Sequence, residues 1–496
     1  MTDWGRAAEA RSALGRSEVP RIAVIGGGIS GLAAAHRLSE LAASRRAPVE
    51  AILIEALNRL GGTITTEHAG GYLVEGGPDS FLTEKPWGVD LCARLGLASR
   101  LVLTQPAHRR TLVLRGRRLL PLPEGFQLLA PSRLIPLWRS PMLSWRGKLR
   151  ATTDLILPPR RSRGDESVAE FVLRRFGREV LDRMVQPLVS GIYAADPSEV
   201  SLLATMPRFA EMERLQGSII RSLRRAAHRR AERNGSGPRW SLFTAPAGGM
   251  QELVSAIAQR IPPSSVKLRR RVTSLARVLG ARPWRVNLAD GTTLFVDAVI
   301  LALPAPRAAR LVGGLDPDLG EQLGAIRYHS SAVVTLAYER AGVHHPLRGF
   351  GFVVPRAERR PILACSVSNF KFAGRAPEGS LLLRTFVGGE AAQDLLARDD
   401  AAIAGATEAQ LCEILGISSR PLLVRVHRHA GAMPHYEVGH GDRVEAIRRR
   451  VSQHPGLAIA GNALTGVGIP DCIHAGEQAA ERAFEHAAGP VKEPVQ

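Results

Sequence analysis

The chain has 496 residues, of which 45% are hydrophobic and 23% charged, a composition typical of a globular protein with two to four domains. This excludes a wholly disordered chain, a collagen-like fibre and a coiled coil, and no stretch approaches the roughly 18 uninterrupted apolar residues of a membrane span. The four cysteines form no CxxC pair, which excludes a disulfide scaffold and a zinc ribbon and indicates a reducing compartment.

The net charge of +20 comes from 66 Lys and Arg against 46 Asp and Glu, and only five of the basic residues are Lys. So high a ratio of Arg to Lys reflects either a GC-rich genome or a functional basic surface that attracts anions. Nucleic acid is the least favoured anion, because there is no zinc-finger or RNP motif and 5% aromatic residues are too few for a stacking surface. We expect no nucleic-acid partner, and no metal site, since His344-His345 has no further ligands nearby.

The first ordered unit is predicted at residue 21, after a polar, Ala- and Arg-rich stretch (1–20) that we expect to be a disordered tail. Residues 21–25 form a short apolar run typical of a buried parallel strand, and a helical pattern extends from Leu32 to about Ala43. Residues 50–54 predict the next strand. The order strand, helix, strand is that of a dinucleotide-binding unit.

Gly26-x-Gly28-x-x-Gly31 connects the first strand to the helix. The first glycine permits a tight turn, the second lets the backbone approach a pyrophosphate, and the third lets the helix pack closely on the strand. The helix N-terminus then offers N–H donors to phosphate. Glu55 follows Gly31 by 24 residues, at the end of the second strand, where a carboxylate accepts hydrogen bonds from a ribose.

Further along the chain, short strands and turns are expected up to residue 125, including a hairpin around Arg115–Arg118, and then mostly helices. A capping box at Ser167-x-x-Glu170 opens one of these helices. Asp290-Gly291 predicts a second hairpin. The remaining predicted elements are a buried strand (297–303), an antiparallel sheet (331–339, 350–354, 361–367 and 380–387), a helix (400–416), a strand (457–460), a Gly-rich loop (461–468) and a helix (473–485).

We therefore predict an α/β fold in which a discontinuous Rossmann-type domain carries an α+β antiparallel-sheet substrate domain and a helical insertion. The predicted boundaries are 21–70, 245–312 and 421–486 for the nucleotide-binding domain, 71–125 and 313–420 for the substrate-binding domain, 126–244 for the helical insertion, and 1–20 and 487–496 for the tails.

Several motifs resemble a known family. Glu55-Ala-x-x-Arg59-x-Gly61-Gly62 resembles the second fingerprint of FAD-dependent oxidoreductases of the amine-oxidase type, in which Arg59 can bind phosphate and the glycines let backbone approach the cofactor. Gly466-Val-Gly-Ile-Pro-Asp-Cys-Ile473 is similar to the C-terminal motif of the protoporphyrinogen oxidase and coproporphyrinogen III oxidase family. Further segments resemble that family in the same order: 75–81, 165–171, 187–197, 349–355 and 371–377.

The resemblance implies an FAD enzyme of haem biosynthesis. It would oxidise protoporphyrinogen IX to protoporphyrin IX in three two-electron steps, each moving a hydride to flavin N5, with oxygen reduced to hydrogen peroxide. Coproporphyrinogen III is the alternative substrate. It carries four rim carboxylates instead of two, and in so Arg-rich a sequence the extra cations that would bind them cannot be recognised. Because the flavin performs the chemistry, no catalytic side chain is expected.

The resemblance also implies particular site residues. Arg110, or by one residue Arg109, would bind a propionate, and Leu336, Val353 and Val367 would be apolar walls, although core packing explains these three equally well. The implied cofactor contacts are Gly26, Gly27, Gly28, Ile29, Ser30, Gly31, Glu55, Ala56, Arg59, Gly62, Thr63, Gly77, Pro78, Val272, Asn462, Val467, Gly468 and Ile469. The sequence departs from the family pattern at Thr63, His429 and Leu464, which puts substrate placement and rate in doubt.

Residues 133–163 hold eight basic residues and one acid, interleaved with large apolar side chains. That mixture suits an element on an anionic membrane surface, and a solvated basic hairpin is the alternative. We expect a cytoplasmic protein in peripheral contact with the cytoplasmic face of the membrane. The resemblance adds a homodimer and a transient contact with the next haem-pathway enzyme. Two other functions stay open: an amine-oxidase-type flavoenzyme acting on amines or carotenoid precursors, and an inactive flavoprotein scaffold.

Overall fold

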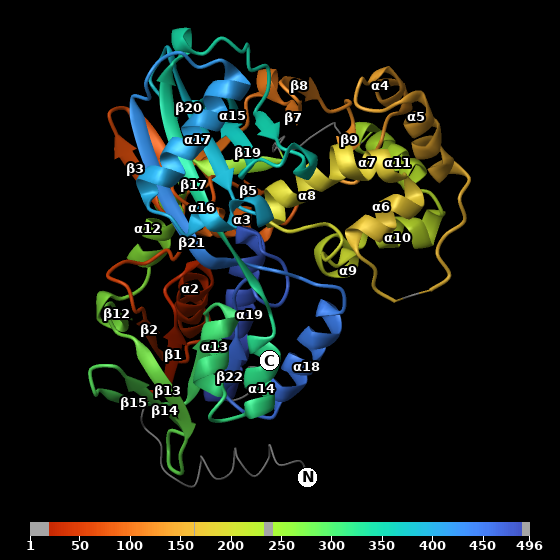
Figure 1. Cartoon of the computed structure of the whole chain (residues 1–496). Helices are drawn as coiled ribbons and strands as arrows, with labels where there is room; N and C mark the ends of the chain where they lie inside the picture. The colour runs from red at the N-terminus through yellow and green to blue at the C-terminus, as the bar shows by residue number, and fades with distance from the viewer. Residues whose placement is uncertain (1–18, 163, 233–241, 489–496) are drawn as a thin grey trace.

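The computed structural model describes residues 19–162, 164–232 and 242–488, so most of the predicted tails, 1–20 and 487–496, lies outside the described residues. Residues 487 and 488 are not tail but the end of the last helix, which reaches Ala488. Three lobes are visible in Figure 1: a nucleotide-binding lobe at the bottom, a sheet lobe at the upper left and a helical lobe at the right. The chain passes between them several times, as the discontinuous boundaries predict. Among the described residues, no helix is long and apolar enough to cross a membrane.

The nucleotide-binding lobe is built on a parallel five-stranded sheet of order β12-β2-β1-β16-β22. Successive residues of β1 point to opposite faces, so Ile22 and Val24 pack with the helices α2 and α19 while Ala23 and Ile25 pack with α13. Both faces are thus buried, which explains the continuous apolar runs of its strands. The elements of this lobe are β1 Arg21–Ile25, α2 Ile29–Ser44, β2 Glu50–Ile54, α12 Met250–Gln259, β12 Val266–Lys267, β13 Val272–Arg277, β14 Trp284–Leu288, β15 Thr293–Val296, β16 Ala298–Leu301, α13 Ala305–Val312, α14 Pro317–Gly324, α18 His440–Ser452, β22 Leu457–Ile459 and α19 Ile469–Ala488.

The predicted strands of this lobe are confirmed, and two helix starts differ. Helix α2 begins at Ile29, immediately after Gly28, and α19 begins at Ile469, four residues before the predicted start. Pro470 lies in the first turn of α19, where a missing backbone N–H costs no hydrogen bond. The helix therefore reaches further into the Gly-rich loop than its apolar pattern indicates.

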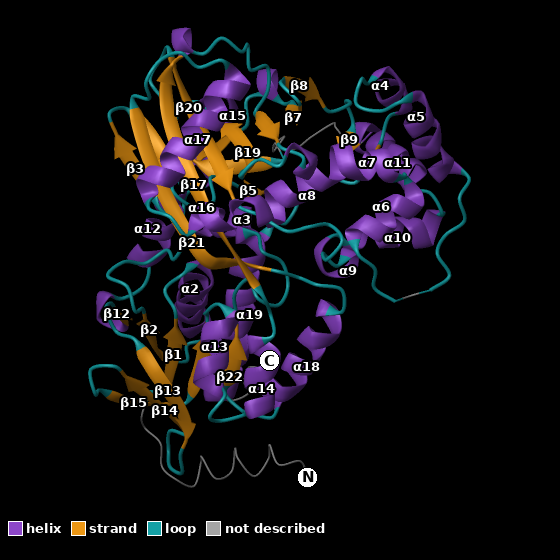
Figure 2. Ribbon diagram, viewed as in Figure 1, coloured by secondary structure: helices purple, strands orange, loops and turns teal. Residues whose placement is uncertain are grey.

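The sheet lobe contains a seven-stranded sheet of order β21-β17-β20-β19-β18-β7-β8, in which only β18 and β7 are parallel neighbours. Helix α17 covers one face (Figure 2), and its Ile403 and Leu411 pack into the core with the strands. The elements are β7 Thr111–Arg115, β8 Arg118–Pro121, β17 Tyr328–Glu339, β18 Gly351–Val353, β19 Ile362–Val367, α15 Ser368–Lys371, β20 Ser380–Val387, α16 Gln393–Leu396, α17 Asp400–Leu415 and β21 Leu423–Pro434.

Two domain boundaries differ from the prediction. Helix α14, which falls in the predicted substrate-binding segment 313–420, packs into the nucleotide-binding core through Leu319 and Leu323. Residues from 421 onward were assigned to the nucleotide-binding domain, whereas β21 pairs antiparallel with β17 along the edge of the seven-stranded sheet. The chain returns to the nucleotide-binding lobe only after Pro434. The reason is that β21 is a polar edge strand, with His427, Arg428 and His429 in its middle, and so carries little apolar alternation.

The helical lobe has its own core, centred on Phe171, Phe176 and Phe209. The predicted capping box is present, since Ser167 and Glu170 exchange their side-chain and backbone hydrogen bonds at the start of α6. Arg175 is fully buried and pairs with Asp154 at 2.5 Å. The helices are α4 Leu134–Arg139, α5 Trp145–Thr152, α6 Val168–Arg175, α7 Arg178–Val180, α8 Gln186–Tyr193, α9 Leu202–Thr205, α10 Pro207–Gln216 and α11 Ile219–Glu232.

Short elements connect the lobes. A hairpin and a three-stranded sheet lie between the nucleotide-binding and sheet lobes, and they carry the chain into the segment 75–81. These elements are β3 Thr66–Ala69, β4 Tyr72–Glu75, β5 Phe81–Leu82, α3 Trp87–Arg94, β6 Leu101–Leu103 and β11 Phe243–Pro246, with a small ribbon of β9 Phe126–Gln127 and β10 Ala130–Pro131 in the helical lobe.

Candidate active site

The glycine turn between β1 and α2 forms an open cradle. A Cβ on Gly31 would lie 1.8 Å from the Gly26 carbonyl oxygen, so this glycine is required for close packing. A Cβ on Gly28, in contrast, would meet nothing within 4 Å, although Gly28 is the residue before the first turn of the 16-residue helix α2. The space over Gly28 at a helix N-terminus fits the pyrophosphate of a dinucleotide.

Glu55 lies at the edge of this cradle. Its carboxylate accepts hydrogen bonds from the backbone N–H of Gly27 at 2.6 Å and of Leu57 at 2.8 Å, which fixes its orientation beside the turn. The amide of Arg270 donates to the Glu55 carbonyl oxygen, and Val272 follows two residues later at the start of β13. The structure therefore brings Glu55 and the segment of Val272 together.

Arg59 occupies a different position from the one expected of a free phosphate ligand. Its guanidinium donates to the carbonyl oxygens of Gly62 at 2.6 Å and Ile64 at 3.1 Å, so it stiffens the turn after β2. A Cβ on Gly62 would lie 3.2 Å from the Gly28 Cα, which places this turn directly against the cradle. Arg59 thus stabilises the turn that packs against the cradle.

The segment from Glu75 to Phe81, which we call the glycine–proline loop, packs onto the same turn. A Cβ on Gly77 would lie 1.9 Å from the Thr63 carbonyl oxygen, so the predicted contacts Thr63 and Gly77 lie side by side. Arg384, buried in the middle of β20, donates to the carbonyl oxygens of Glu75 and Gly77. Sequence reasoning missed Arg384, although a lone Arg within the apolar run of β20 could have indicated a buried role.

A partly buried ion pair holds the far end of this loop. The Lys371 ammonium binds the two Asp79 carboxylate oxygens at 2.8 and 3.0 Å and the Ser80 hydroxyl at 2.8 Å. Burial alone would raise the pKa of Asp79, but the charges of Lys371 and Arg384 hold that pKa well below its usual range. The carboxylate is therefore ionised, and it fixes the loop against α15.

Histidines of β21 contact the same loop from below. The His429 Nε2 lies 2.8 Å from the Gly76 carbonyl oxygen, to which it donates, and burial lowers the pKa of His429. A Cβ on Gly76 would lie 2.4 Å from the His427 ring. His429, which departs from the family pattern, thus supports the loop as a neutral hydrogen-bond donor.

The C-terminal Gly-rich loop closes the cradle from the other side. The Asn462 carbonyl oxygen accepts a hydrogen bond from the Tyr436 hydroxyl at 2.6 Å, and its amide group donates to the Ala432 carbonyl oxygen at 3.2 Å. The Asp471 carboxylate packs against Gly466 and pairs with Lys85 at 2.5 Å. These contacts fix Val467, Gly468 and Ile469 at the N-terminus of α19, next to α2.

The predicted apolar wall residues lie on two different faces of the seven-stranded sheet. Leu336 and Val367 both stand opposite Leu383, and all three fill the core under α17. Val353 stands opposite Ala364 on the other face, where both pack against Gly191 of α8. Arg384 stands opposite Ser366 and shares the face of Val353. The structure thus brings Val353, but not Leu336 or Val367, to the side of the glycine–proline loop.

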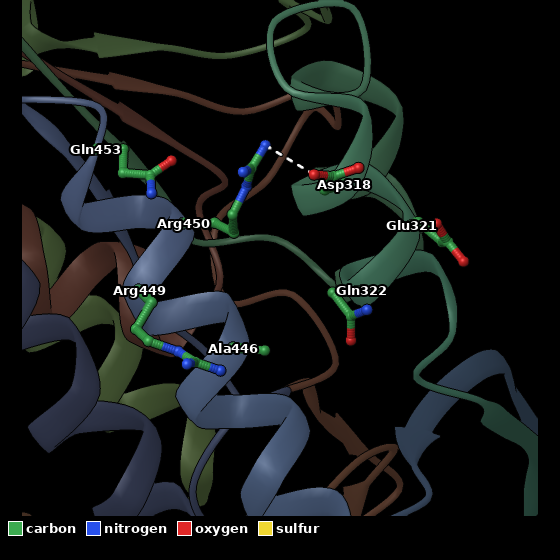
Figure 3. A pocket seen from close by; sticks show the side chains of 7 residues that line it. All are labelled: Asp318, Glu321, Gln322, Ala446, Arg449, Arg450 and Gln453. Carbon is green, nitrogen blue, oxygen red and sulfur yellow. Dashed lines mark ion pairs between the residues drawn. The ribbon is translucent and has the colours of Figure 1, made fainter.

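Arg110 lines an open cleft of about 290 Å³ together with His108, Arg348 and Phe370, whereas Arg109 does not line it. A second cleft of about 380 Å³ lies between α14 and α18 (Figure 3). There Arg450 points toward Asp318, pairs with it at 3.1 Å, and also binds Asp316, the N-cap of α14. Its guanidinium is therefore already neutralised, and this cleft is a structural junction in the nucleotide-binding lobe.

A parallel sheet with a glycine cradle, a carboxylate at the end of its second strand and a second sheet lobe packed over the cradle define a dinucleotide-dependent oxidoreductase. Residues 29–483 match the family described as flavin containing amine oxidoreductase, and the chain belongs to this family. It is accordingly an FAD-dependent oxidoreductase, and the open cradle over Gly28 fits this cofactor.

Three relatives match nearly the whole chain. It is 34% identical over 466 residues to coproporphyrinogen III oxidase of Bacillus subtilis (strain 168), covering 94% of this chain and 98% of the relative. It is 31% identical over 486 residues to protoporphyrinogen oxidase 1, chloroplastic, of Spinacia oleracea, covering 94% and 83%. A crystal structure from Exiguobacterium sp. 255-15, with a provisional protoporphyrinogen oxidase name, matches with a TM-score of 0.81 and 29% identity, covering 94% and 98%.

Proposed function

We propose that this protein oxidises a porphyrinogen to the corresponding porphyrin in haem biosynthesis, with oxygen as the final electron acceptor. The observation that carries the proposal is the similarity, at 31 to 34% identity and over 94% of the chain, to proteins named as oxidases of two different porphyrinogens. FAD, held by the residues of the cradle, would supply the redox chemistry as an acceptor of hydride from the macrocycle. The protein's residues bind, orient and enclose the two molecules.

Cofactor binding is assigned to the residues around the glycine cradle. Gly26 to Gly31 would hold the phosphates, Glu55 would bind the ribose hydroxyls, and Ala56, Arg59 and Gly62 would form the adjoining turn. Thr63, Gly77 and Pro78 on one side, and the start of α19 with Asn462 on the other, enclose the remainder, with Val272 beyond Glu55. Two features support this assignment: the open space over Gly28 and the tight contact between Thr63 and Gly77.

Substrate binding is assigned to the face of the seven-stranded sheet that carries Val353. That face is apolar where it meets α8 of the helical lobe, through Val353, Ala364 and Gly191. A porphyrinogen is a large apolar ring with carboxylates at its rim, so it needs an apolar slot and nearby cations. Arg110 supplies one cation at the edge of the same sheet, in a cleft whose Leu347 and Phe370 belong to the core on the α17 side, and this cleft favours Arg110 over Arg109.

Protoporphyrinogen IX and coproporphyrinogen III are both candidate substrates. Relatives named as oxidases of each porphyrinogen match the chain. Three of them are named coproporphyrinogen III oxidase and one protoporphyrinogen oxidase. The deciding experiment offers both porphyrinogens to the purified flavoprotein side by side and follows porphyrin fluorescence in air. The faster kcat/KM identifies the substrate, and turnover of neither contradicts the proposal.

Anaerobic spectra distinguish this function from the two alternatives. Porphyrinogen should bleach the FAD absorption near its long-wavelength maximum, while amines and carotenoid precursors should leave it unchanged. An amine oxidase would show the opposite pattern, and an inactive scaffold would be bleached by none of them. Because the chain has Leu464 where amine oxidases carry an aromatic residue, we expect bleaching by the porphyrinogen alone.

Peripheral contact with an anionic membrane at its cytoplasmic face is part of the proposal. The two short helices α4 and α5 expose Ile135 (68%) and Trp145 (66%), and Ile156 after them is 82% exposed. They lie at the outer end of the helical lobe (Figure 1). Apolar side chains interleaved with Arg suit insertion among anionic headgroups, where a poorly soluble porphyrin could leave the protein.

Homodimer formation and a transient contact with the enzyme that receives the porphyrin complete the proposal. Both rest on the likeness to the porphyrinogen oxidases, and neither requires a change in the site described above. Sedimentation of the purified holoenzyme at several concentrations tests the first. Channelling of product in a coupled assay, measured against an added porphyrin trap, tests the second.

A further inference from the structure

The cleft that contains Arg110 is formed where two strands enter the sheet side by side. Arg110 precedes β7 and Arg348 precedes β18, and the two strands are parallel neighbours, with Thr111 opposite Gly351. The amide of Phe350 donates to the Arg110 carbonyl oxygen at 2.9 Å. A Cβ on Gly349 would lie 2.4 Å from that oxygen, so only glycine permits this approach. The backbone therefore holds Arg348 next to Arg110 at the rim of the cleft.

Both arginines have free donors. Within the described part of the chain, neither guanidinium makes an ion pair or a hydrogen bond. Two other arginines near this sheet are neutralised: Arg360 pairs with Glu413 at 2.8 Å and Arg356 with Asp196 at 2.5 Å. Two unneutralised cations in one cleft repel one another. A ligand with two negative charges relieves this repulsion, so the arrangement favours its binding.

The remainder of the cleft is apolar and flat. The rings of His108 and Phe370 stack with their centroids 4.3 Å apart and an interplanar angle of 10°. Leu347 and Pro346 complete the wall. A site with two cations at its rim and a stacked ring pair as its floor suits a molecule with an apolar body and anionic arms.

The cleft is connected rigidly to the glycine–proline loop. Phe370 is followed by Lys371, whose ammonium binds Asp79 of that loop. On the other side, the Gln105 amide donates to the Lys371 carbonyl oxygen at 3.0 Å and its side chain to the Asn369 carbonyl oxygen at 2.8 Å. The segment that carries Arg110 and the loop expected to contact the flavin are thus attached to the same short helix, α15.

We propose that Arg348 is a second carboxylate-binding residue, and that Arg110 and Arg348 together hold two neighbouring carboxylate arms of the porphyrinogen. This inference rests on the proposed function, because it assumes a macrocycle with carboxylates at its rim. The pair orients the ring relative to the glycine–proline loop. Since adjacent carboxylate arms occur in both the dicarboxylate and the tetracarboxylate porphyrinogen, the pair serves both substrates alike.

The test compares Arg348→Gln, Arg348→Lys and Arg110→Gln with the unmodified holoenzyme, on free-acid porphyrinogens and on their fully esterified forms. We expect Arg348→Gln to raise KM for the free acids about tenfold, with kcat within about twofold, because one charge-assisted pair is lost in ground state and transition state alike. Arg348→Lys should recover part of the loss, since it keeps the charge without the bidentate fork. KM for the esters should not change in any variant.

Arg307→Gln is the matched control, because Arg307 is exposed on α13, far from the cleft in sequence and in a different lobe. A KM for free acids that is unchanged in Arg348→Gln would overturn the inference, and so would an equal rise for the esters, since that would indicate a loss of shape rather than charge. If the unmodified holoenzyme oxidises neither free acid, the proposed function fails instead. Binding of the free-acid porphyrin products, followed by fluorescence quenching, gives a second readout that does not require turnover.

Discussion

The guanidinium of Arg384 donates to the carbonyl oxygen of Gly77 from the middle of a neighbouring lobe. Arg384 is 3% exposed and donates also to the Glu75 carbonyl oxygen, so one side chain of the substrate sheet fixes the loop that adjoins the cofactor cradle. The nucleotide-binding lobe and the sheet lobe are therefore joined through backbone carbonyls of the glycine–proline loop. Four predictions follow from this and from related contacts.

Replacing Arg384 with Met should loosen the loop and weaken FAD binding. The substitution removes two charge-assisted hydrogen bonds and leaves two carbonyl groups without these donors, which should cost about 3 kcal/mol in the free energy of unfolding. The ratio of flavin to protein absorbance and the Tm of the holoenzyme measure both effects. Arg360→Met, on the rim of the same sheet, is the control and should keep its full flavin content. Full flavin content in Arg384→Met would contradict this view of the loop.

The Asp79–Lys371 pair should make stability depend on acid pH. The pKa of Asp79 is depressed in the folded protein, so its contribution to the free energy of unfolding is complete above the unfolded pKa of about 4 and is lost as pH falls below that value. Asp79→Asn should lower the free energy of unfolding at pH 7 by about 3 kcal/mol, because Lys371 would remain unpaired. It should also flatten the fall of this free energy between pH 5 and 3, because the titrating carboxylate is absent. Urea titrations at several pH values give the free energy of unfolding as a function of pH. The same pH dependence in Asp79→Asn and in the unmodified protein would refute the prediction.

Gly28 and Gly31 should respond differently to alanine. A Cβ on Gly28 meets no protein atom within 4 Å, so Gly28→Ala should fold with an unchanged Tm in the cofactor-free state and bind FAD at least tenfold more weakly. A Cβ on Gly31 would lie 1.8 Å from the Gly26 carbonyl oxygen, so Gly31→Ala should destabilise the protein with or without the cofactor. Calorimetry of the two variants with and without added FAD separates steric from ligand effects. Equal destabilisation in both would argue against an open cradle.

The exposed side chains of α4 and α5 should bind anionic vesicles. The protein should co-sediment with vesicles containing phosphatidylserine or phosphatidylglycerol, and rising salt should release it, because screening weakens the attraction between Arg side chains and headgroups. Ile135→Ser with Trp145→Ser should reduce binding severalfold, whereas Leu215→Ser, at an equally exposed apolar site on α10, should not. Equal capture by neutral vesicles at high salt would exclude the electrostatic account.

Much of the fold was predictable because its signals are local. The strand Arg21–Ile25, the glycine turn and the strand Glu50–Ile54 follow from consecutive residues, and both predicted hairpins are confirmed around Arg115–Arg118 and Asp290-Gly291. Family motifs extended this to the cofactor, because they occur in a fixed order along the chain and the family model matches residues 29–483.

Other features depended on partners distant in the chain. The sequence could not determine which face of the sheet Leu336, Val353 and Val367 occupy, because a buried strand is apolar on both faces and only the pairing register decides its orientation. In the same way, β21 joined the substrate sheet through its pairing with β17, and the pairing of β7 with β18 is what brings Arg110 and Arg348 to one cleft.

The amino-acid sequence by itself determined the chemistry that this protein can perform: a glycine turn, a carboxylate and a C-terminal motif, each read over a few residues, indicate a flavoprotein. Only the tertiary structure decided which side chains hold the site together, since Arg384 and Lys371 bind atoms of the glycine–proline loop that lie hundreds of residues away in the chain. The physical reason is that backbone conformation is set by near neighbours, whereas charge pairing and sheet register are set by contacts that exist only after the lobes have packed.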